Sequence, residues 1–263
     1  MKVEFLGTGA ADFDIGKRDE YKEFRRFSST LINDDLLIDP GPHIFDYIEK
    51  TNHPNLFDGV KYIIVTHSHG DHFNADSVKK LYEVCPEVIL VGDKVLKERI
   101  VAKYPELLGL ASMTPDMMKT ESFGDYDITA LPGNHTLSLF GEDETRHYYI
   151  VERSSGKKLF YGVDGAWLTS NEWGFLKGKR CDAMILELTI GEAPSDDRIF
   201  THTNIGMLKI MLETIRKQRA IEQGGKIYTT HMARTLHYDQ ATLTEQLRPM
   251  NATPAYDGMK ITI

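Results

Sequence analysis

Directly after a short apolar segment, the sequence reads Thr66-His67-Ser68-His69-Gly70-Asp71-His72. Four potential metal ligands within six residues cannot all point at one ion. Alternate side chains of an extended segment face the same way, so His67 and His69 can bind one metal ion. Gly70 then lets the chain turn, after which Asp71 and His72 can address a second position. The stretch therefore predicts ligands for two neighbouring ions.

Imidazole and carboxylate groups suit zinc, manganese or iron. A polar surface loop with chance histidines is the alternative, but the spacing, the carboxylate and the position after a strand argue together against it. A metal site needs more ligands than one loop supplies. Three further candidates, each of which could alternatively be a capping or surface residue, follow predicted strands: His135, Asp164 and His231. Strand ends on one edge of a sheet converge, so these residues can complete two coordination shells.

Short β-branched or aromatic segments, bounded by turn residues, predict the strands. They are Val3–Leu6, Ser29–Ile38, Tyr62–Thr66, Val88–Val91, Ile128–Leu131, Tyr148–Val151, Leu159–Val163, Ala183–Leu188 and Lys226–Thr229. Helical periodicity predicts helices at Ala75–Val84, Ile205–Ile221 and Gln240–Leu247. A short glycine-containing turn at 153–157 predicts a hairpin. The pattern fits two mixed sheets packed together with helices outside, in a single domain over residues 1–263.

The composition is that of a water-soluble protein, with 41% hydrophobic and 27% charged residues. A formal net charge of -8 disfavours a dedicated nucleic-acid binder, because such proteins usually carry a basic balance. Cys85 and Cys181 lie far apart and are interpreted as packing residues without a disulfide. No apolar segment approaches the ~18–20 residues needed to span a bilayer, and the start lacks a signal region. We therefore expect a cytoplasmic location and no membrane partner.

The pattern His-x-His-x-Asp-His, with the later His, Asp and His at strand ends, resembles the metallo-β-lactamase superfamily. The similarity covers nearly the whole chain and includes Phe5-Leu6-Gly7-Thr8-Gly9 and Leu37-Ile38-Asp39-Pro40-Gly41. It implies an α/β fold of the αβ/βα four-layer sandwich type, with two mixed β-sheets flanked by helices. It also implies two divalent metal ions, zinc or manganese, with iron as a further option.

The resemblance also implies which residues hold each ion. His67, His69 and His135 would bind the first metal, Asp71, His72 and His231 the second, and Asp164 would bridge the two. Asp39 would orient a ligand histidine, a role that metal sites commonly need. The alternative for Asp39 is a polar residue at a strand-to-turn corner.

The segment Phe200-Thr201-His202-Thr203-Asn204, placed before a predicted helix, resembles the phosphodiesterase branch of the superfamily. This branch includes transfer-RNA 3′-processing ribonucleases and the cyclic ribose-phosphate phosphodiesterase of the carbon–phosphorus lyase pathway. In that reaction a metal-bridging hydroxide would attack phosphorus. His202 would protonate the leaving oxygen, and Glu187 would favour its protonated form. The resemblance thus implies catalytic roles for Asp71, His202 and Glu187; simple capping of the helix is the alternative for His202.

The end of the chain, Ala255–Ile261, resembles the cyclic phosphodiesterase, and no Gly/Pro-rich arm for gripping transfer RNA is found. We therefore expect a small sugar- or nucleotide-phosphate diester as substrate. Transfer-RNA 3′ processing, thioester or lactam hydrolysis, and a scaffold that has lost catalysis remain alternatives, and a homodimer stays open. The loop from Lys17 to Arg26 either assists substrate binding or is a solvated basic loop. His43 is expected at the site rim, His237 near the substrate, and His53 and His147 at the surface.

Overall fold

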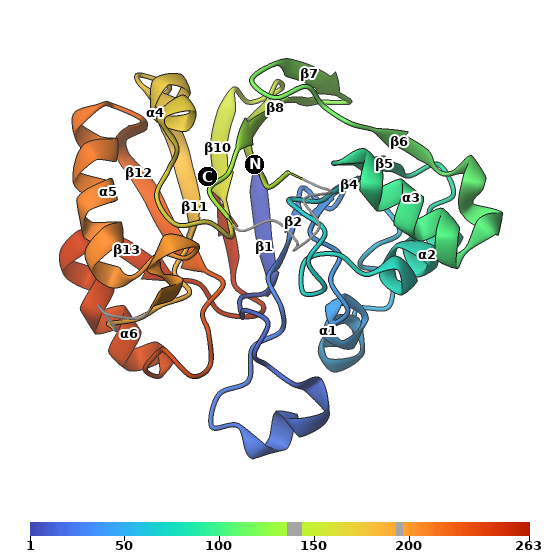
Figure 1. The fold of residues 1–263 in the computed structure, drawn as a ribbon, viewed down its shortest axis with the longest axis horizontal. Coiled ribbons are helices and arrows are strands. Elements are labelled where there is room, and N and C mark those ends of the chain that lie inside the picture. Colours follow the sequence, from blue (N-terminus) through green and yellow to red (C-terminus); the bar gives the residue numbers. More distant parts are fainter. Residues whose placement is uncertain (136–143, 193–196) are drawn as a thin grey trace. The chain divides into compact units, whose positions relative to one another are not determined.

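A computed structural model describes residues 1–135, 144–192 and 197–263. The chain folds into two compact units. Unit 1 is formed mainly by Met1–Pro115 and Asp257–Thr262, and unit 2 mainly by Thr145–Tyr256 together with residues 116–135. Each unit contains one mixed sheet of seven strands (Figure 1). The single domain expected over residues 1–263 stays a prediction.

The sheet of unit 1 has the strand order β14-β1-β2-β3-β4-β5-β6. The strands are β1 (Lys2–Gly7), β2 (Ser29–Ile32), β3 (Leu36–Ile38), β4 (Tyr62–Ile64), β5 (Ile89–Val91), β6 (Ala111–Met113) and β14 (Lys260–Thr262). From β14 to β3 neighbours are antiparallel, and from β3 to β6 they are parallel. The helices are α1 (Ile44–Thr51), α2 (Ala75–Val84) and α3 (Lys94–Lys103), with 3₁₀ turns η1 (Ile15–Glu20) and η2 (Pro105–Gly109). Apolar residues of all three α-helices share one buried cluster with strand residues, so the helices cover one face of this sheet.

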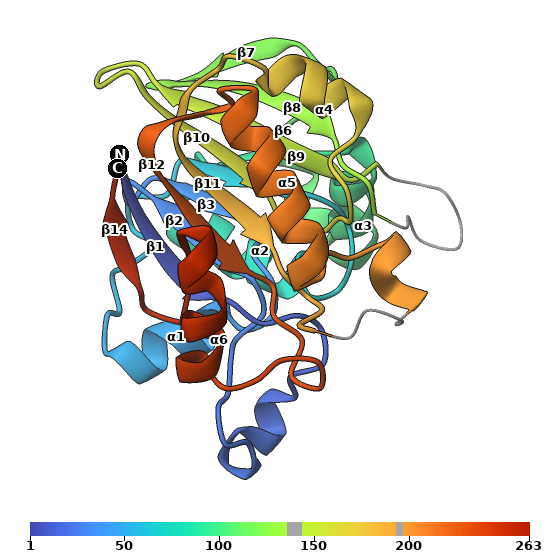
Figure 2. The same cartoon turned by 90° about the vertical axis from the view of Figure 1, so that its left-hand side faces the viewer.

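The sheet of unit 2 has the strand order β13-β12-β11-β10-β9-β8-β7. The strands are β7 (Thr120–Phe123), β8 (Tyr126–Pro132), β9 (Arg146–Glu152), β10 (Lys157–Gly162), β11 (Cys181–Glu187), β12 (Ile221–Thr230) and β13 (Ala252–Pro254). Neighbours are parallel from β13 to β10 and antiparallel from β10 to β7. The helices are α4 (Ser170–Leu176), α5 (Ile205–Lys217) and α6 (Gln240–Leu247), with η3 (Asp197–Phe200) and η4 (Arg248–Met250). In Figure 2 these α-helices lie in front of the sheet.

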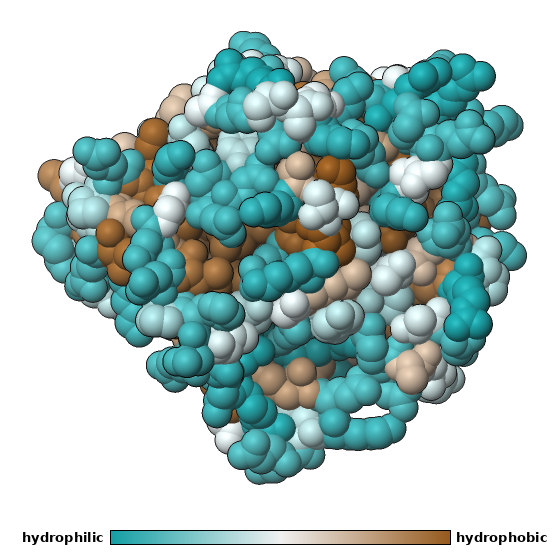
Figure 3. Space-filling model, turned by 180° about the vertical axis from the view of Figure 1, so that it is seen from behind, coloured by the Kyte–Doolittle hydropathy of each residue, from teal (hydrophilic) through white to brown (hydrophobic). Residues whose placement is uncertain are grey.

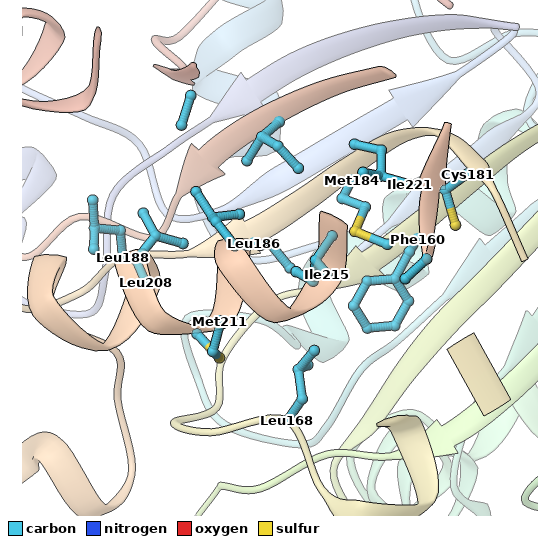
Figure 4. Packing of buried hydrophobic residues seen from close by; sticks show 14 of the residues in the cluster. Phe160, Leu168, Cys181, Met184, Leu186, Leu188, Leu208, Met211, Ile215 and Ile221 are labelled. Atoms are coloured by element: carbon cyan, nitrogen blue, oxygen red, sulfur yellow. The ribbon is translucent and has the colours of Figure 1, made fainter. Parts of the chain in front are cut away.

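The core of unit 2 explains why α5 lies on this sheet. Its apolar residues recur at helical spacing, so Leu208, Met211 and Ile215 form one buried stripe. Figure 4 shows Leu208 and Ile215 of this stripe near Leu186 and Met184 of β11, and Met211 belongs to the same buried cluster. Side chains of a strand alternate between the two faces, so the next residue, Glu187, is directed away from the helices.

The fold class expected from the sequence is confirmed: two mixed sheets flanked by helices. α2 and α6 have the predicted bounds, and the hairpin between β9 and β10 is present. One prediction was wrong, because Ser29–Ile38 is not continuous but forms β2, a turn and β3. Asn33 and Asp34 occupy that turn in the left-handed conformation. The short strands β6, β7, β13 and β14 and the helices α1, α3 and α4 were not predicted.

Cys85 and Cys181, both within the described residues, are free thiols, as expected. Among the described residues, no helix has the length and apolar character needed to span a membrane. On the face shown in Figure 3, hydrophilic residues predominate and hydrophobic ones form smaller patches between them.

Candidate metal centre

The four predicted ligands of unit 1 gather in the loop after β4. His67 and His72 are buried. The ring centroid of His67 lies 4.4 Å from that of His69 and 4.3 Å from that of His72. Potential ligand atoms of His67 and His69 lie within 4.8 Å of each other, as do those of Asp71 and His72. The loop therefore presents two pairs of donors, in the pairing that the sequence predicts.

This loop is held by its own backbone. The backbone N–H groups of His72 and Phe73 both donate to the carbonyl oxygen of His69, at 3.0 and 2.8 Å. Arg99 adds a hydrogen bond of 3.0 Å from its Nη1 to the carbonyl oxygen of Ser68. The predicted turn at Gly70 is present. Gly70 is not among the residues with positive φ, and an added Cβ would meet nothing within 4 Å, so this turn does not require glycine.

Asp39 positions His72, as the resemblance implies. The Asp39 side chain is fully buried, and its Oδ2 lies 2.9 Å from Nδ1 of His72. Its Oδ1 accepts from the backbone N–H of Thr66 at 2.7 Å, and the Thr66 hydroxyl lies 3.0 Å from both oxygens. The Asp39 carboxylate accepts the proton of Nδ1, so it selects the tautomer in which the lone pair of His72 lies on Nε2 and can bind a metal ion. That Nε2 lies 3.5 Å from Oδ2 of Asp71.

The three predicted ligands of unit 2 also gather. They follow strands that run in the same direction, namely β8, β10 and β12, so they emerge at one edge of the sheet. Asp164 Oδ2 lies 3.3 Å from Nε2 of His135 and 3.7 Å from Nε2 of His231. Asp164 and His231 have left-handed backbones, with φ of 65° and 61°, which turn the chain sharply after the strands. Such conformations are uncommon among non-glycine residues as a whole, and they cluster at functional sites.

His202 and Glu187 join this group. Glu187 ends β11, and His202 lies between η3 and α5. Nδ1 of His202 lies 2.9 Å from Oδ1 of Asp164 and 3.5 Å from Oε2 of Glu187. Glu187 is itself fixed, because it accepts hydrogen bonds from the backbone N–H groups of Thr189, at 3.1 Å, and of Thr203. The predicted neighbours His202 and Glu187 are therefore in contact.

The carboxylates and imidazoles of unit 2 perturb one another. Burial opposes the charged form of His202, but Asp164 and then Glu187 raise its pKa to about 10. Burial alone would raise the pKa of Glu187, but its hydrogen bonds with His202 and His231 lower it to about 2. Against the same effect of burial, the charges of His231, His135 and His202 hold the pKa of Asp164 well below its usual value. His202 therefore favours its charged form beside the ionised carboxylates of Asp164 and Glu187.

Comparison with known proteins identifies the family. The Beta-lactamase superfamily domain matches residues 35–232, which is most of the chain. The chain belongs to the beta-lactamase superfamily. No curated protein matches the sequence significantly.

Solved structures share the fold over the full chain. A diphosphatase of the PhnP family is 18% identical, with a TM-score of 0.71 over 100% of this chain and 97% of that one. The short form of human tRNase Z is 19% identical, with a TM-score of 0.70 over 100% and 99%. Zn²⁺-bound PqqB from Methylobacterium extorquens is 16% identical, with a TM-score of 0.71 over 100% of both chains. At these identities the likeness shows the fold alone.

The donor groups suit divalent metal ions. Each unit brings imidazole and carboxylate groups together, and most of them are buried. Nitrogen and oxygen donors of this kind bind zinc and manganese. Together with membership in the beta-lactamase superfamily, they support a metal-dependent hydrolase. The assignment of each residue to a particular ion stays a prediction.

The remaining histidines have structural partners or are exposed. His53 is exposed, as predicted, but the prediction that His147 lies at the surface was wrong, because its side chain is only 3% exposed. His43 precedes α1, stacks on Phe27 with centroids 3.9 Å apart, and accepts from the Phe27 N–H at 3.2 Å. Nε2 of His237 contacts the carbonyl oxygen of Leu188. The expected places of His43 and His237 near the substrate stay predictions.

Three arginines of the loop from Lys17 to Arg26 have partners within unit 1. Arg18 and Arg26 both form ion pairs with Asp46, and Arg26 lies 3.3 Å from Asp257. Arg25 is buried and donates to the Thr8 hydroxyl at 2.8 Å. These guanidinium groups hold the loop on unit 1. The alternative of a solvated basic loop is therefore wrong for these three arginines.

Proposed function

We propose that this chain is a phosphodiesterase that uses two divalent metal ions. In this proposal one ion takes His67, His69 and His135, the other takes Asp71, His72 and His231, and Asp164 serves both. Membership in the superfamily supports this arrangement, as does the position of both donor groups after strands of mixed sheets. When bound, the two ions would hold a phosphoryl oxygen and lower the pKa of a nearby water molecule.

The observation that carries the choice of a phosphodiester is the position of His202. Its Nδ1 faces two carboxylates, at 2.9 Å on Asp164 and 3.5 Å on Glu187. Opposite charges at these distances favour the imidazolium form. Because Nδ1 is directed to the carboxylates, Nε2 is the nitrogen that can donate a proton to the leaving oxygen. Thioester or lactam hydrolysis would use the same metal ions but has no comparable need for His202.

Glu187 acts through His202. The backbone N–H groups of Thr189 and Thr203 fix its carboxylate, so the charge cannot turn away from the imidazole. A fixed charge of this kind stabilises the protonated ring without moving during the reaction. Asp71 belongs to the other donor group and would contribute through its metal ion.

The net charge bears on the class of substrate. A net charge of -8 disfavours a large polyanion, whose binding depends on many phosphate contacts. We therefore propose a small sugar- or nucleotide-phosphate diester, cyclic or linear, as the substrate. The PhnP-family diphosphatase and human tRNase Z share the fold, and the activities in their names support hydrolysis of phosphate linkages by this chain.

The test uses purified protein loaded with zinc or manganese and bis-p-nitrophenyl phosphate as substrate. We expect hydrolysis that disappears on chelation and returns on adding metal. On a cyclic nucleotide diester, whose leaving sugar oxygen needs a proton, His202→Ala should lower kcat by ~10²–10⁴-fold, the usual range for lost acid–base catalysis, while its metal content stays unchanged. His53→Ala, which changes an exposed histidine, is the matched control.

Each other outcome is informative. An unchanged rate in His202→Ala would remove His202 from the mechanism. Hydrolysis of a glutathione thioester or a β-lactam, with none of phosphodiesters, would replace the reaction class. Cleavage of precursor transfer RNA in preference to small diesters would replace the substrate class. Fewer than one ion per chain after reconstitution would refute the metal centre.

A further inference from the structure

His147 is a buried imidazole with both ring nitrogens engaged. It lies on β9, and its Nδ1 is 2.5 Å from Oε1 of Glu172. Its Nε2 lies 3.3 Å from the backbone carbonyl oxygen of Asp164. Both partners are acceptors, so the ring satisfies both only when it carries a proton on each nitrogen. His147 has no part in the proposed catalytic steps, yet it directly contacts the loop that presents Asp164.

Glu172 connects this imidazole to the start of α4. It is fully buried, and its Oε2 accepts from the backbone N–H of Thr169 at 2.6 Å. The Thr169 hydroxyl accepts from the Glu172 N–H at 3.2 Å, which completes a capping box. The same hydroxyl lies 3.1 Å from the carbonyl oxygen of Pro132, the last residue of β8. The start of α4 is therefore tied to the strand that leads to His135.

The ring of His147 fits between two ligand loops. A Cβ added at Gly133, two residues before His135, would lie 3.0 Å from Nε2 of His147. A Cβ added at Gly165, next to Asp164, would lie 3.2 Å from the same nitrogen. Only glycine leaves comfortable room for the ring at these two places. The loops are also joined directly, because the Ala166 N–H donates to the carbonyl oxygen of Asn134 at 2.9 Å.

We propose that His147 and Glu172 form a positioning pair that fixes the loops of His135 and Asp164 in the geometry needed for metal binding. The proposal rests on the proposed function, because it assigns these two residues as ligands. Asp164 has a left-handed backbone with φ of 65°, a conformation that persists only where its surroundings enforce it. His147 provides one such constraint at the Asp164 carbonyl, and Thr203 provides another by donating to the carbonyl oxygens of Gly165 and Ala166 at 3.1 and 2.9 Å.

The test compares His147→Gln and Glu172→Gln with the wild-type protein and with Leu247→Ala. Leu247 is a fully buried residue of α6 in the core of unit 2, so its truncation destabilises the unit without touching the two loops. Zinc affinity is measured by competition with a chromophoric chelator, and geometry by the absorption bands of the Co²⁺-substituted protein. We expect either pair variant to weaken zinc binding by ~10–100-fold and to change the cobalt bands. Leu247→Ala should lower the unfolding temperature and keep wild-type metal affinity.

A measurement without metal separates this proposal from the proposed function. In the metal-free protein, the amide of Ala166 should exchange with solvent faster in both pair variants than in Leu247→Ala. The double variant His147→Gln/Glu172→Gln should lose little more affinity than either single variant, because both residues act as a unit. If His147→Gln does not fold, Glu172→Gln, which keeps the size and an acceptor for the Thr169 N–H, decides the question.

The outcomes are distinct. Wild-type protein that binds no metal refutes the proposed function, and the exchange of Ala166 then tests the positioning pair alone. Wild-type protein that binds metal, with both pair variants equal to it in affinity, cobalt spectrum and Ala166 exchange, overturns the positioning pair only.

Discussion

The substitution Asp39→Asn isolates the effect of one buried charge on the ligand loop of unit 1. Asp39 has φ of 56°, and asparagine tolerates this left-handed conformation, so the backbone need not change. The side chain keeps its shape. In Asp39, Oδ1 accepts from the Thr66 N–H and Oδ2 accepts from His72. In the asparagine variant, an NH₂ donor replaces one of these two oxygens. In a fully buried site, that donor must face another donor or force His72 to change its tautomer.

Either result has a definite size. If the NH₂ group faces the Thr66 N–H, two buried donors lose their acceptor, and a buried unsatisfied group costs ~1–3 kcal/mol. If it faces His72, Nδ1 becomes the acceptor and the ring proton moves to Nε2, the nitrogen that should bind the metal ion. Adding the lost charge-assisted hydrogen bond, we expect destabilisation of about 2–4 kcal/mol in the metal-free protein. Metal affinity should fall by ~10–100-fold.

Guanidinium unfolding of the metal-free protein, followed by circular dichroism, measures the first effect, and competitive zinc titration measures the second. Asp34→Asn is the control, because Asp34 is also left-handed, with φ of 64°, but its side chain is exposed. An Asp39→Asn protein with the unfolding midpoint and zinc affinity of the control would show that the contacts of Asp39 with Thr66 and His72 contribute nothing. The assigned role of Asp39 would then be wrong.

Two further predictions concern unit 1. Burial lowers the pKa of His43 from 6.5 to about 4, despite the opposing charge of Asp46. The folded state therefore favours the neutral ring. Its contribution to stability is complete above pH 6.5 and is lost as the pH drops toward 4. At ~1.4 kcal/mol per pKa unit, the loss of stability approaches ~3 kcal/mol. His43→Asn keeps an acceptor for the Phe27 N–H, so its unfolding temperature should fall less between pH 7 and 4.5 than that of His53→Asn. Equal falls in the two variants would contradict the assignment. Gly41→Ala should cost ~1–3 kcal/mol of stability, since its Cβ would lie 2.3 Å from the backbone oxygen of Asp71, whereas Gly70→Ala should be tolerated, as measured by unfolding midpoints.

Where the sequence succeeded, the signal was local. α2 repeats apolar residues at helical spacing, and Asn74 caps it, so both its face and its start can be read from the chain. The ligand loop was found because four donor side chains occur within six residues. Strand ends were sufficient to propose Asp164 and His231, because parallel strands carry their carboxyl ends to one edge.

Where the sequence failed, pairing or burial came from distant residues. β6 is three residues long with all three residues exposed, and only its pairing with β5 makes it a strand. The turn between β2 and β3 had a usable signal in Asn33-Asp34-Asp35, which hydrophobic periodicity does not register. The buried state of His147 depends on Glu172, 25 residues away, which no periodicity reveals. The capping-box spacing of Thr169 and Glu172 was nevertheless a readable sign of α4.

The strand register explains why donor residues lie close together in unit 2. In the parallel half of its sheet, Gly162 pairs with Leu186, and Leu186 pairs with Thr229. The ends of β10, β11 and β12 are therefore neighbours, and so are the residues that follow them. If β11 were shifted by one residue against β10, the Glu187 side chain would lie on the face of the sheet that α5 covers, and the Leu186 side chain would lie on the opposite face. A glutamate among the apolar residues of α5 would lose its partners Thr189, Thr203 and His202. The register that buries Leu186 against α5 is therefore the same register that places the Glu187 carboxylate beside His202.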